Sequence, residues 1–149
     1  MRLPSRGFTL IEILMVLVVV GIMMRIGLPF LRTGTNKSSV RGAMDAVASM
    51  HARAKAIAIQ RGRIAGIVMN PSAGTMFIAA RNTGGTAWDT VGRVENMRNR
   101  FGVTFTTTQN AIAFSPRGIG ADVAATTIII TKSGFSDTLI SSVGGRLIR

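Results

Sequence analysis

The chain has 149 residues and a formal net charge of +12 at pH 7, and it contains no cysteine. The length fits one small domain plus an additional segment, since domains run to roughly 100–200 residues. The lack of cysteine excludes disulfides, thiolate catalysis and cysteine-bound zinc. The positive charge favours polyanionic partners such as nucleic acid or anionic lipid head groups, although a soluble surface rich in arginine accounts for it equally well.

The N-terminal segment differs in composition from the rest of the chain. Residues 1–7 carry two arginines, and residues 8–24 contain a single charged side chain, that of Glu12. A secretory signal peptide would have a shorter apolar stretch and a small-residue cleavage site, which is missing here. A membrane anchor fits better, because residues 8–31 would form a helix about 36 Å long, enough to cross a hydrocarbon core of about 30 Å.

Glu12 is unusual for a membrane anchor. A carboxylate inside an apolar helix costs about 2.5–3.5 kcal/mol on insertion scales, so it is expected to have a partner. Cleavage between Gly7 and Phe8 would create an α-amino group one helical turn before Glu12, on the same helical face. This amine would pair with Glu12 of the same chain or of a neighbouring subunit whose helix packs alongside.

Residues 7–12, Gly-Phe-Thr-Leu-Ile-Glu, and the apolar run after them resemble the processing site of type IV pilins and the related pseudopilins. The resemblance implies cleavage after Gly7 by a prepilin peptidase, N-methylation of Phe8 and assembly with other pilins or pseudopilins through the N-terminal helix. Residues 1–7 would then be a leader peptide and residues 8–31 a helix of the membrane and filament core. Pro29 matches the family's proline late in this helix, where it would kink or loosen it.

The membrane topology rests on the resemblance and not on counting charges. Four cations at or beyond the end of the segment, Arg25, Arg32, Lys37 and Arg41, outnumber the two arginines before it, and counting alone would place the C-terminal side in the cytoplasm. The rule weakens when a long domain follows. The resemblance implies a single-pass protein of the bacterial inner membrane, with a cytoplasmic N-terminus and a periplasmic domain.

Residues 32–149 are expected to form that domain, and its first element is a helix over about residues 37–61. Apolar side chains recur there at spacings of three and four. His51, the only histidine, lies at the edge of this face and is expected to be packed there, with no functional role.

Residues 62–149 are expected to be rich in β-strands, with residues 81–100 irregular. The expected strands, bounded by turn residues, are 64–69, 75–79, 103–107, 111–114, 126–131, 138–142 and 146–148. A helix followed by antiparallel strands predicts an α+β fold, in which a long N-terminal helix packs on antiparallel sheets.

The domain resembles the GspH/FimT subgroup of pseudopilins and minor pilins. The resemblance rests on residues 52–56 (Ala-Arg-Ala-Lys-Ala), on residues 114–118 (Phe-Ser-Pro-Arg-Gly) and on a terminal strand that closes on Gly145 and Arg146. It implies a minor subunit of a type II secretion system or a type IV pilus assembly. Some members contact DNA during natural transformation through a basic C-terminal Gly-Arg-x-Arg pattern, so the alternative function is DNA uptake.

Six arginines are candidates for binding DNA: Arg61, Arg63, Arg98, Arg100, Arg146 and Arg149. On a strand, residues two apart share a face, whereas residues three apart do not. The first two pairs would therefore share a face if extended, while the last pair is one residue too widely spaced for the family pattern. Aromatic side chains that would stack on single-stranded bases are scarce, with one Trp and no Tyr.

No catalytic constellation is present in the sequence. There is one His and no Cys, and the carboxylates outside the anchor show no metal-ligand spacing. The glycine-rich stretches match no phosphate-binding loop. The chain is therefore expected not to be an enzyme and to have no cofactor, metal or small-molecule substrate.

Overall fold

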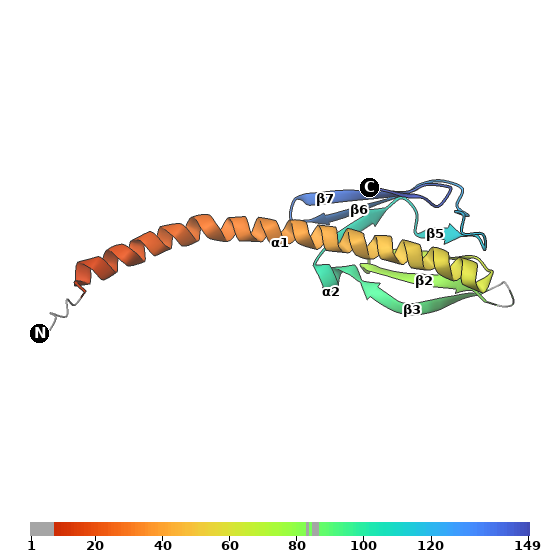
Figure 1. Ribbon diagram of the computed structural model, residues 1–149, viewed down its shortest axis with the longest axis horizontal. Helices are drawn as coiled ribbons and strands as arrows, with labels where there is room; N and C mark the ends of the chain where they lie inside the picture. The colour runs from red at the N-terminus through yellow and green to blue at the C-terminus, as the bar shows by residue number, and fades with distance from the viewer. Residues whose placement is uncertain (1–7, 83, 85–86) are drawn as a thin grey trace, which may run out of the picture. The chain divides into compact units, whose positions relative to one another are not determined.

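The computed structural model describes residues 8–82, 84 and 87–149, leaving out the side chains of residues 26–33. It divides into two compact units, an N-terminal unit Met1–Thr35 and a C-terminal unit Asn36–Arg149. Helix α1, Leu10–Arg61, contributes to both units (Figure 1).

Within the C-terminal unit, α1 buries one continuous face. The buried side chains recur at spacings of three and four, as an amphipathic helix requires. They are Val40, Ala43, Met44, Val47, Met50, Ala54 and Ala58. The predicted helical periodicity over residues 37–61 is therefore confirmed, and the last helical residue is Arg61 as expected.

The first sheet contains four antiparallel strands in the order β3-β2-β1-β5. Its strands are β1 (Ala65–Asn70), β2 (Thr75–Arg81), β3 (Trp88–Asn96) and β5 (Ala111–Phe114). The β1–β2 turn is closed by the Asn70 side chain, whose Oδ1 accepts a hydrogen bond from the Ala73 N–H at 3.1 Å. The short helix α2 (Met97–Phe101) follows β3.

The second sheet is also antiparallel, in the order β4-β6-β7-β8. Its strands are β4 (Thr104–Thr107), β6 (Thr126–Lys132), β7 (Phe135–Ser141) and β8 (Leu147–Ile148). The β6–β7 hairpin turns on Ser133 and Gly134, both with positive φ, as a two-residue hairpin of the primed type requires.

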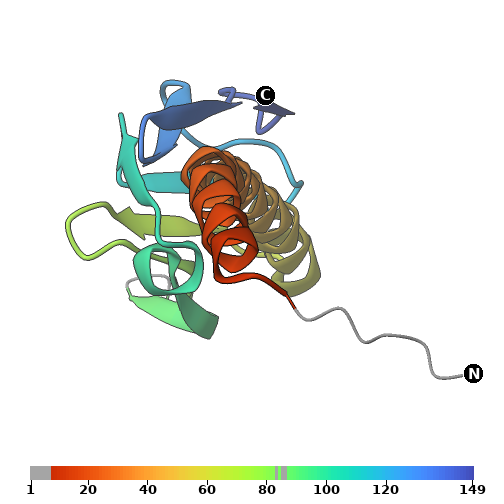
Figure 2. The same ribbon diagram turned by 90° about the vertical axis from the view of Figure 1, so that its left-hand side faces the viewer.

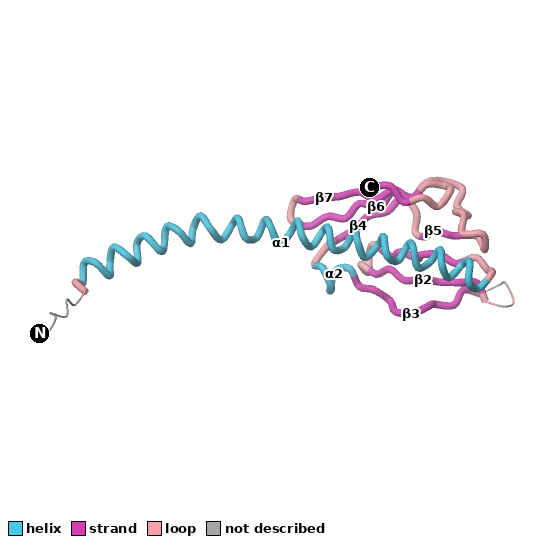
Figure 3. Tube along the Cα trace, viewed as in Figure 1, coloured by secondary structure: helices cyan, strands magenta, loops and turns pink. Residues whose placement is uncertain are grey.

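The core of the C-terminal unit lies between α1 and the two sheets. Strands β2 and β3 flank α1 on one side, and β6 and β7 on the other (Figures 2 and 3). The buried cluster joins Val47 of α1 to Ile67 and Ile112 of the first sheet and to Ile128 and Ile130 of the second. A helix packed on antiparallel sheets is the predicted fold class, which is confirmed.

The prediction that residues 81–100 are irregular was wrong, because β3 and α2 occupy most of this range. No residue of β3 is fully buried, so the strand lacks the apolar alternation that would reveal it in the sequence. Its order comes from pairing with β2, across a register shift between Met76 and Ile78. Helix α2 is capped by Asn96, whose side chain accepts a hydrogen bond from the Asn99 N–H at 2.9 Å.

Glycines in the segment after β5 allow parts of the backbone to approach closely. A Cβ on Gly120 would lie 2.1 Å from the Val143 carbonyl oxygen and 2.6 Å from the Gly145 amide nitrogen. Gly118 packs against Ile59 near the end of α1. The sequence Phe-Ser-Pro-Arg-Gly at residues 114–118 therefore leads the chain from the first sheet into contact with the β7–β8 connection of the second.

Candidate functional site

The predicted processing site spans Gly7 and Phe8, of which Gly7 lies outside the described residues. Phe8 is 76% exposed, and α1 begins at Leu10. Phe8 therefore precedes the helix in this uncleaved chain, whereas the spacing of four residues predicted that it shares a helical face with Glu12. The pairing of the new amine with Glu12 remains a prediction for the processed chain.

Thr9 caps the start of α1, a role that the sequence analysis missed. The Glu12 N–H donates hydrogen bonds to the Thr9 carbonyl at 3.1 Å and to its Oγ1 at 3.3 Å. Thr at the N-cap with Glu three residues later is the capping-box pattern, so Thr-x-x-Glu was a signal available in the sequence. A carboxylate in the first helical turn is also stabilised by the helix dipole. Glu12 therefore has a local role in addition to the predicted role in assembly.

The apolar side chains of residues 10–24 are all exposed. Leu10 is 83% exposed, Leu17 65% and Met23 67%. Exposed apolar surface of this extent marks a region that contacts another protein or a membrane.

No helix within the described part of the chain is both long and apolar enough to cross a membrane. The predicted anchor, residues 8–31, includes residues 26–31, whose side chains are outside the description.

The arginine pairs proposed to share a strand face do not lie on strands. Arg61 is the last residue of α1, and Arg63 follows the helix before β1 begins. Arg98 and Arg100 both lie on α2, where residues two apart point in different directions. The shared face was expected only for an extended backbone, and neither pair meets this condition, because each belongs to a helix or its end. Arg100 is, in addition, ion-paired with Glu95 at 2.9 Å.

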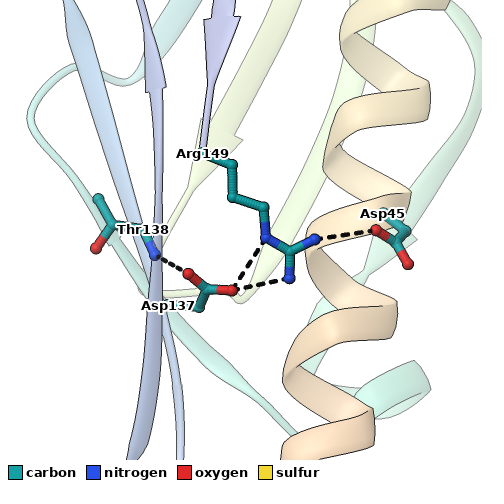
Figure 4. Close-up of polar contacts among 4 residues, drawn as sticks. All are labelled: Asp45, Asp137, Thr138 and Arg149. Carbon is teal, nitrogen blue, oxygen red and sulfur yellow. Dashed lines mark hydrogen bonds and ion pairs between the residues drawn. The ribbon is translucent and has the colours of Figure 1, made fainter.

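Arg149 joins the second sheet to α1. Its guanidinium lies 2.9 Å from the Asp137 carboxylate on β7 and 3.5 Å from that of Asp45 on α1 (Figure 4). The Arg149 hydrogen bonds are the main reason that the pKa of Asp137 lies below its usual value. Arg146 is exposed just before β8. The two C-terminal arginines thus lie in different surroundings. The Arg149 cluster, formed by Arg149, Asp45 and Asp137, could not be predicted because its carboxylates are distant from Arg149 along the chain.

His51 is buried between the helix and both sheets. Its ring packs edge-on against Phe114 of β5, with centroids 4.8 Å apart, and its Nε2 lies 3.4 Å from the Ser141 Oγ of β7. Burial, with a smaller contribution from the charge of Lys55, lowers the pKa of His51. The residue is packed in the core, as expected from its position on the helix.

Residues 2–24 match the prokaryotic N-terminal methylation motif. Over 97% of its length the chain is 27% identical to the pilin-like protein PilA1 of Thermus thermophilus, and the match also covers 97% of that protein. At this identity and with this coverage, the likeness extends beyond the N-terminal motif.

Two solved structures share the fold. The type IV minor pilin FimU of Pseudomonas aeruginosa superposes with a TM-score of 0.61 and 16% identity, covering 76% of this chain and 90% of FimU. The minor pseudopilin EpsH from the type 2 secretion system of Vibrio cholerae gives a TM-score of 0.60 and 10% identity, covering 74% of this chain and 94% of EpsH. The motif implies anchoring in a membrane by the N-terminal helix, processing by a prepilin peptidase and assembly with other pilins. The chain therefore joins this N-terminal motif to a domain with the fold of minor pilins and pseudopilins.

Proposed function

We propose that the protein is a minor subunit of the GspH/FimT type, in a type II secretion system or a type IV pilus assembly. A prepilin peptidase removes residues 1–7, Phe8 is N-methylated, and the N-terminal helix passes from the inner membrane into a filament. The domain then lies on the periplasmic side and contacts other pilins or pseudopilins. The role is structural and not enzymatic.

The observation that carries this proposal is the uncovered apolar surface of α1 directly after the methylation motif. Such a surface is stable only when lipid or a neighbouring helix covers it. Lipid covers it before assembly, and the helices of adjacent subunits cover it in the filament. Glu12 is the one charged side chain in residues 8–24, and the α-amino group of a neighbouring subunit would form an ion pair with its carboxylate.

Substitutions of Glu12 separate its two roles. Glu12→Leu removes both the carboxylate and the capping-box side chain, whereas Glu12→Gln keeps a capping-box residue and removes the charge. We expect both variants to insert into the membrane and both to be recovered in sheared filaments at least tenfold less than the wild type. Thr9→Ala, which loses the cap but keeps the carboxylate, serves as the control and should assemble.

The readout is the ratio of filament-bound to membrane-bound protein on an immunoblot. Normal assembly of Glu12→Gln would show that the charge has no partner and that capping alone explains the residue. That outcome would remove the pairing scheme while leaving the processing claim intact.

The geometry gives little support to DNA uptake as a second function. Its remaining support is the net charge of +12. The six candidate arginines lie at the end of α1, on α2 and on either side of β8, and Arg100 and Arg149 are already paired with carboxylates.

A further inference from the structure

We propose that the outer edge of β7 and the groove beside it bind an extended acidic segment of a partner protein, which adds to the second sheet as a strand. The groove has a volume of about 600 Å³. Its walls include Lys37, Val40 and Arg41 of α1 and Phe135, Ser136 and Asp137 of β7. This inference goes beyond the proposed function and does not depend on it, since it concerns the C-terminal unit alone.

Most of the outer edge of β7 is unpaired within the described chain. Strand β6 pairs with β7 from Phe135 to Ser141, whereas β8 pairs only with Ile140 and Ser141 on the other side. The Thr138 N–H points away from β6, because it donates to the Asp137 Oδ1 at 2.9 Å. An unpaired edge offers backbone donors and acceptors to an incoming strand, which is the basis of recognition by strand addition.

Two cations beside this edge determine the charge of the expected occupant. Lys37 and Arg41 are one helical turn apart on α1, and both are exposed. Among the described residues neither forms a salt bridge, although the charge of Arg41 contributes to lowering the pKa of Asp137. Asp45 and Asp137 are both paired with Arg149. Carboxylates on the incoming strand would form ion pairs with these two cations, while a basic strand would be repelled.

The face of β7 that points away from α1 offers apolar surface for the alternate side chains of a strand. Leu139 is buried on the α1 side, and the next residue, Ile140, is 38% exposed on the opposite face. Since successive side chains of a strand point to opposite sides, an acidic side chain facing α1 and an apolar one facing away suit an alternating sequence. The partner segment we expect therefore alternates acidic and apolar residues.

The Arg149 cluster protects this edge when no partner is bound. One carboxylate oxygen of Asp137 accepts a hydrogen bond from the Thr138 N–H, and the other is paired with the Arg149 guanidinium. Natural sheets often guard an open edge with charged groups in this way. A partner strand would replace Asp137 at the Thr138 N–H, and its carboxylates would lie next to Arg149 as well as Arg41.

The test uses the full chain in detergent micelles and a fluorescent six-residue peptide that alternates glutamate and valine. Binding of the peptide is measured by its fluorescence anisotropy. One control peptide replaces glutamate by lysine. A second keeps the glutamates but carries backbone N-methyl groups on alternate residues, which removes the donors needed for strand addition. We expect the acidic peptide to bind at least tenfold more tightly than either control.

Substitutions in the protein locate the site. Thr138→Pro removes the edge N–H without touching the ladder with β6, and proline is tolerated on an edge of this kind. It should weaken peptide binding at least tenfold, as should the double variant Lys37→Ala with Arg41→Ala. The matched control is Arg93→Ala with Arg117→Ala, which removes the same charge from exposed positions outside the groove and should bind normally.

Three results would overturn the proposal. The first is that the acidic peptide does not bind. The second is that the N-methylated peptide binds as tightly as the unmodified acidic peptide, which would indicate an anion site without strand addition. The third is that the control double variant weakens binding as much as Lys37→Ala with Arg41→Ala. A thermal melt by circular dichroism establishes whether Thr138→Pro is folded. If it is not, the comparison of the two acidic peptides on the wild-type protein decides the question alone.

Discussion

At the scale of single residues, burial accounts for the state of His51. The ring has lost most of its contact with water, and the nearby Lys55 also disfavours its protonated form. The imidazole is therefore neutral in the folded protein at neutral pH. His51 therefore contributes to packing, as expected for a lone histidine on an apolar helical face.

The lowered pKa of His51 predicts a dependence of stability on pH. Above the unfolded value of 6.5 the residue is neutral in both states, so its full contribution is present. As the pH falls below about 6.5 towards the lower folded pKa, the unfolded chain takes up a proton that the folded chain does not, and the free energy of unfolding decreases. Urea denaturation of the full chain in detergent at pH 7.5 and 5.5 measures the change.

The matched variant for this prediction is His51→Gln, which keeps a polar side chain and does not titrate. Its loss of stability between the two pH values should be smaller than that of the wild type. Equal losses in the two proteins would assign the pH dependence to other groups and contradict the proposed state of His51.

At the scale of elements, close backbone approach between the two sheets depends on Gly120. A Cβ there would meet the Val143 carbonyl oxygen at 2.1 Å, and backbone cannot yield as a flexible side chain does. We expect Gly120→Ala to lower the free energy of unfolding by about 1–3 kcal/mol, the usual cost of overpacking. The measurement is again urea denaturation.

Gly144→Ala is the control for this prediction. A Cβ at Gly144 would meet nothing closer than the Ser142 Oγ at 4.0 Å. The substitution should change stability by less than about 0.5 kcal/mol, as is usual at exposed positions without special contacts. Similar effects of both substitutions would refute a specific role for the contact between the β5 segment and the β7–β8 connection.

Some strands could be predicted from local sequence and others could not. Strands β1, β5 and β6 have apolar or β-branched runs between clear turn residues, and the predicted ranges lie within about one residue of the observed ones. Strand β3 has no buried face and was missed, since only its pairing with β2 orders it. Local patterns thus revealed the elements that bury apolar side chains and failed where order comes from a distant partner.

At the scale of the whole molecule, the sequence predicted the class of protein more fully than its surfaces. The six residues from Gly7 to Glu12 lie within the stretch that matches the N-terminal methylation motif, and a motif of consecutive residues can be recognised without a structure. The β7 groove could not, because it combines α1 with β7 and the C-terminal Arg149. Nor could the sequence decide whether the arginine pairs share a face, because that depends on whether the backbone is helical or extended.

The central claim is that the chain is a prepilin processed at the junction of Gly7 and Phe8. The direct measurement is intact-mass and N-terminal peptide mass spectrometry of the full chain, expressed in cells that contain a prepilin peptidase. We predict a wild-type protein that begins at Phe8 with one added methyl group, while Gly7→Leu retains residues 1–7 and the leader variant Ser5→Ala is processed normally. A wild-type protein that keeps its first seven residues, or normal maturation of Gly7→Leu, would contradict the claim.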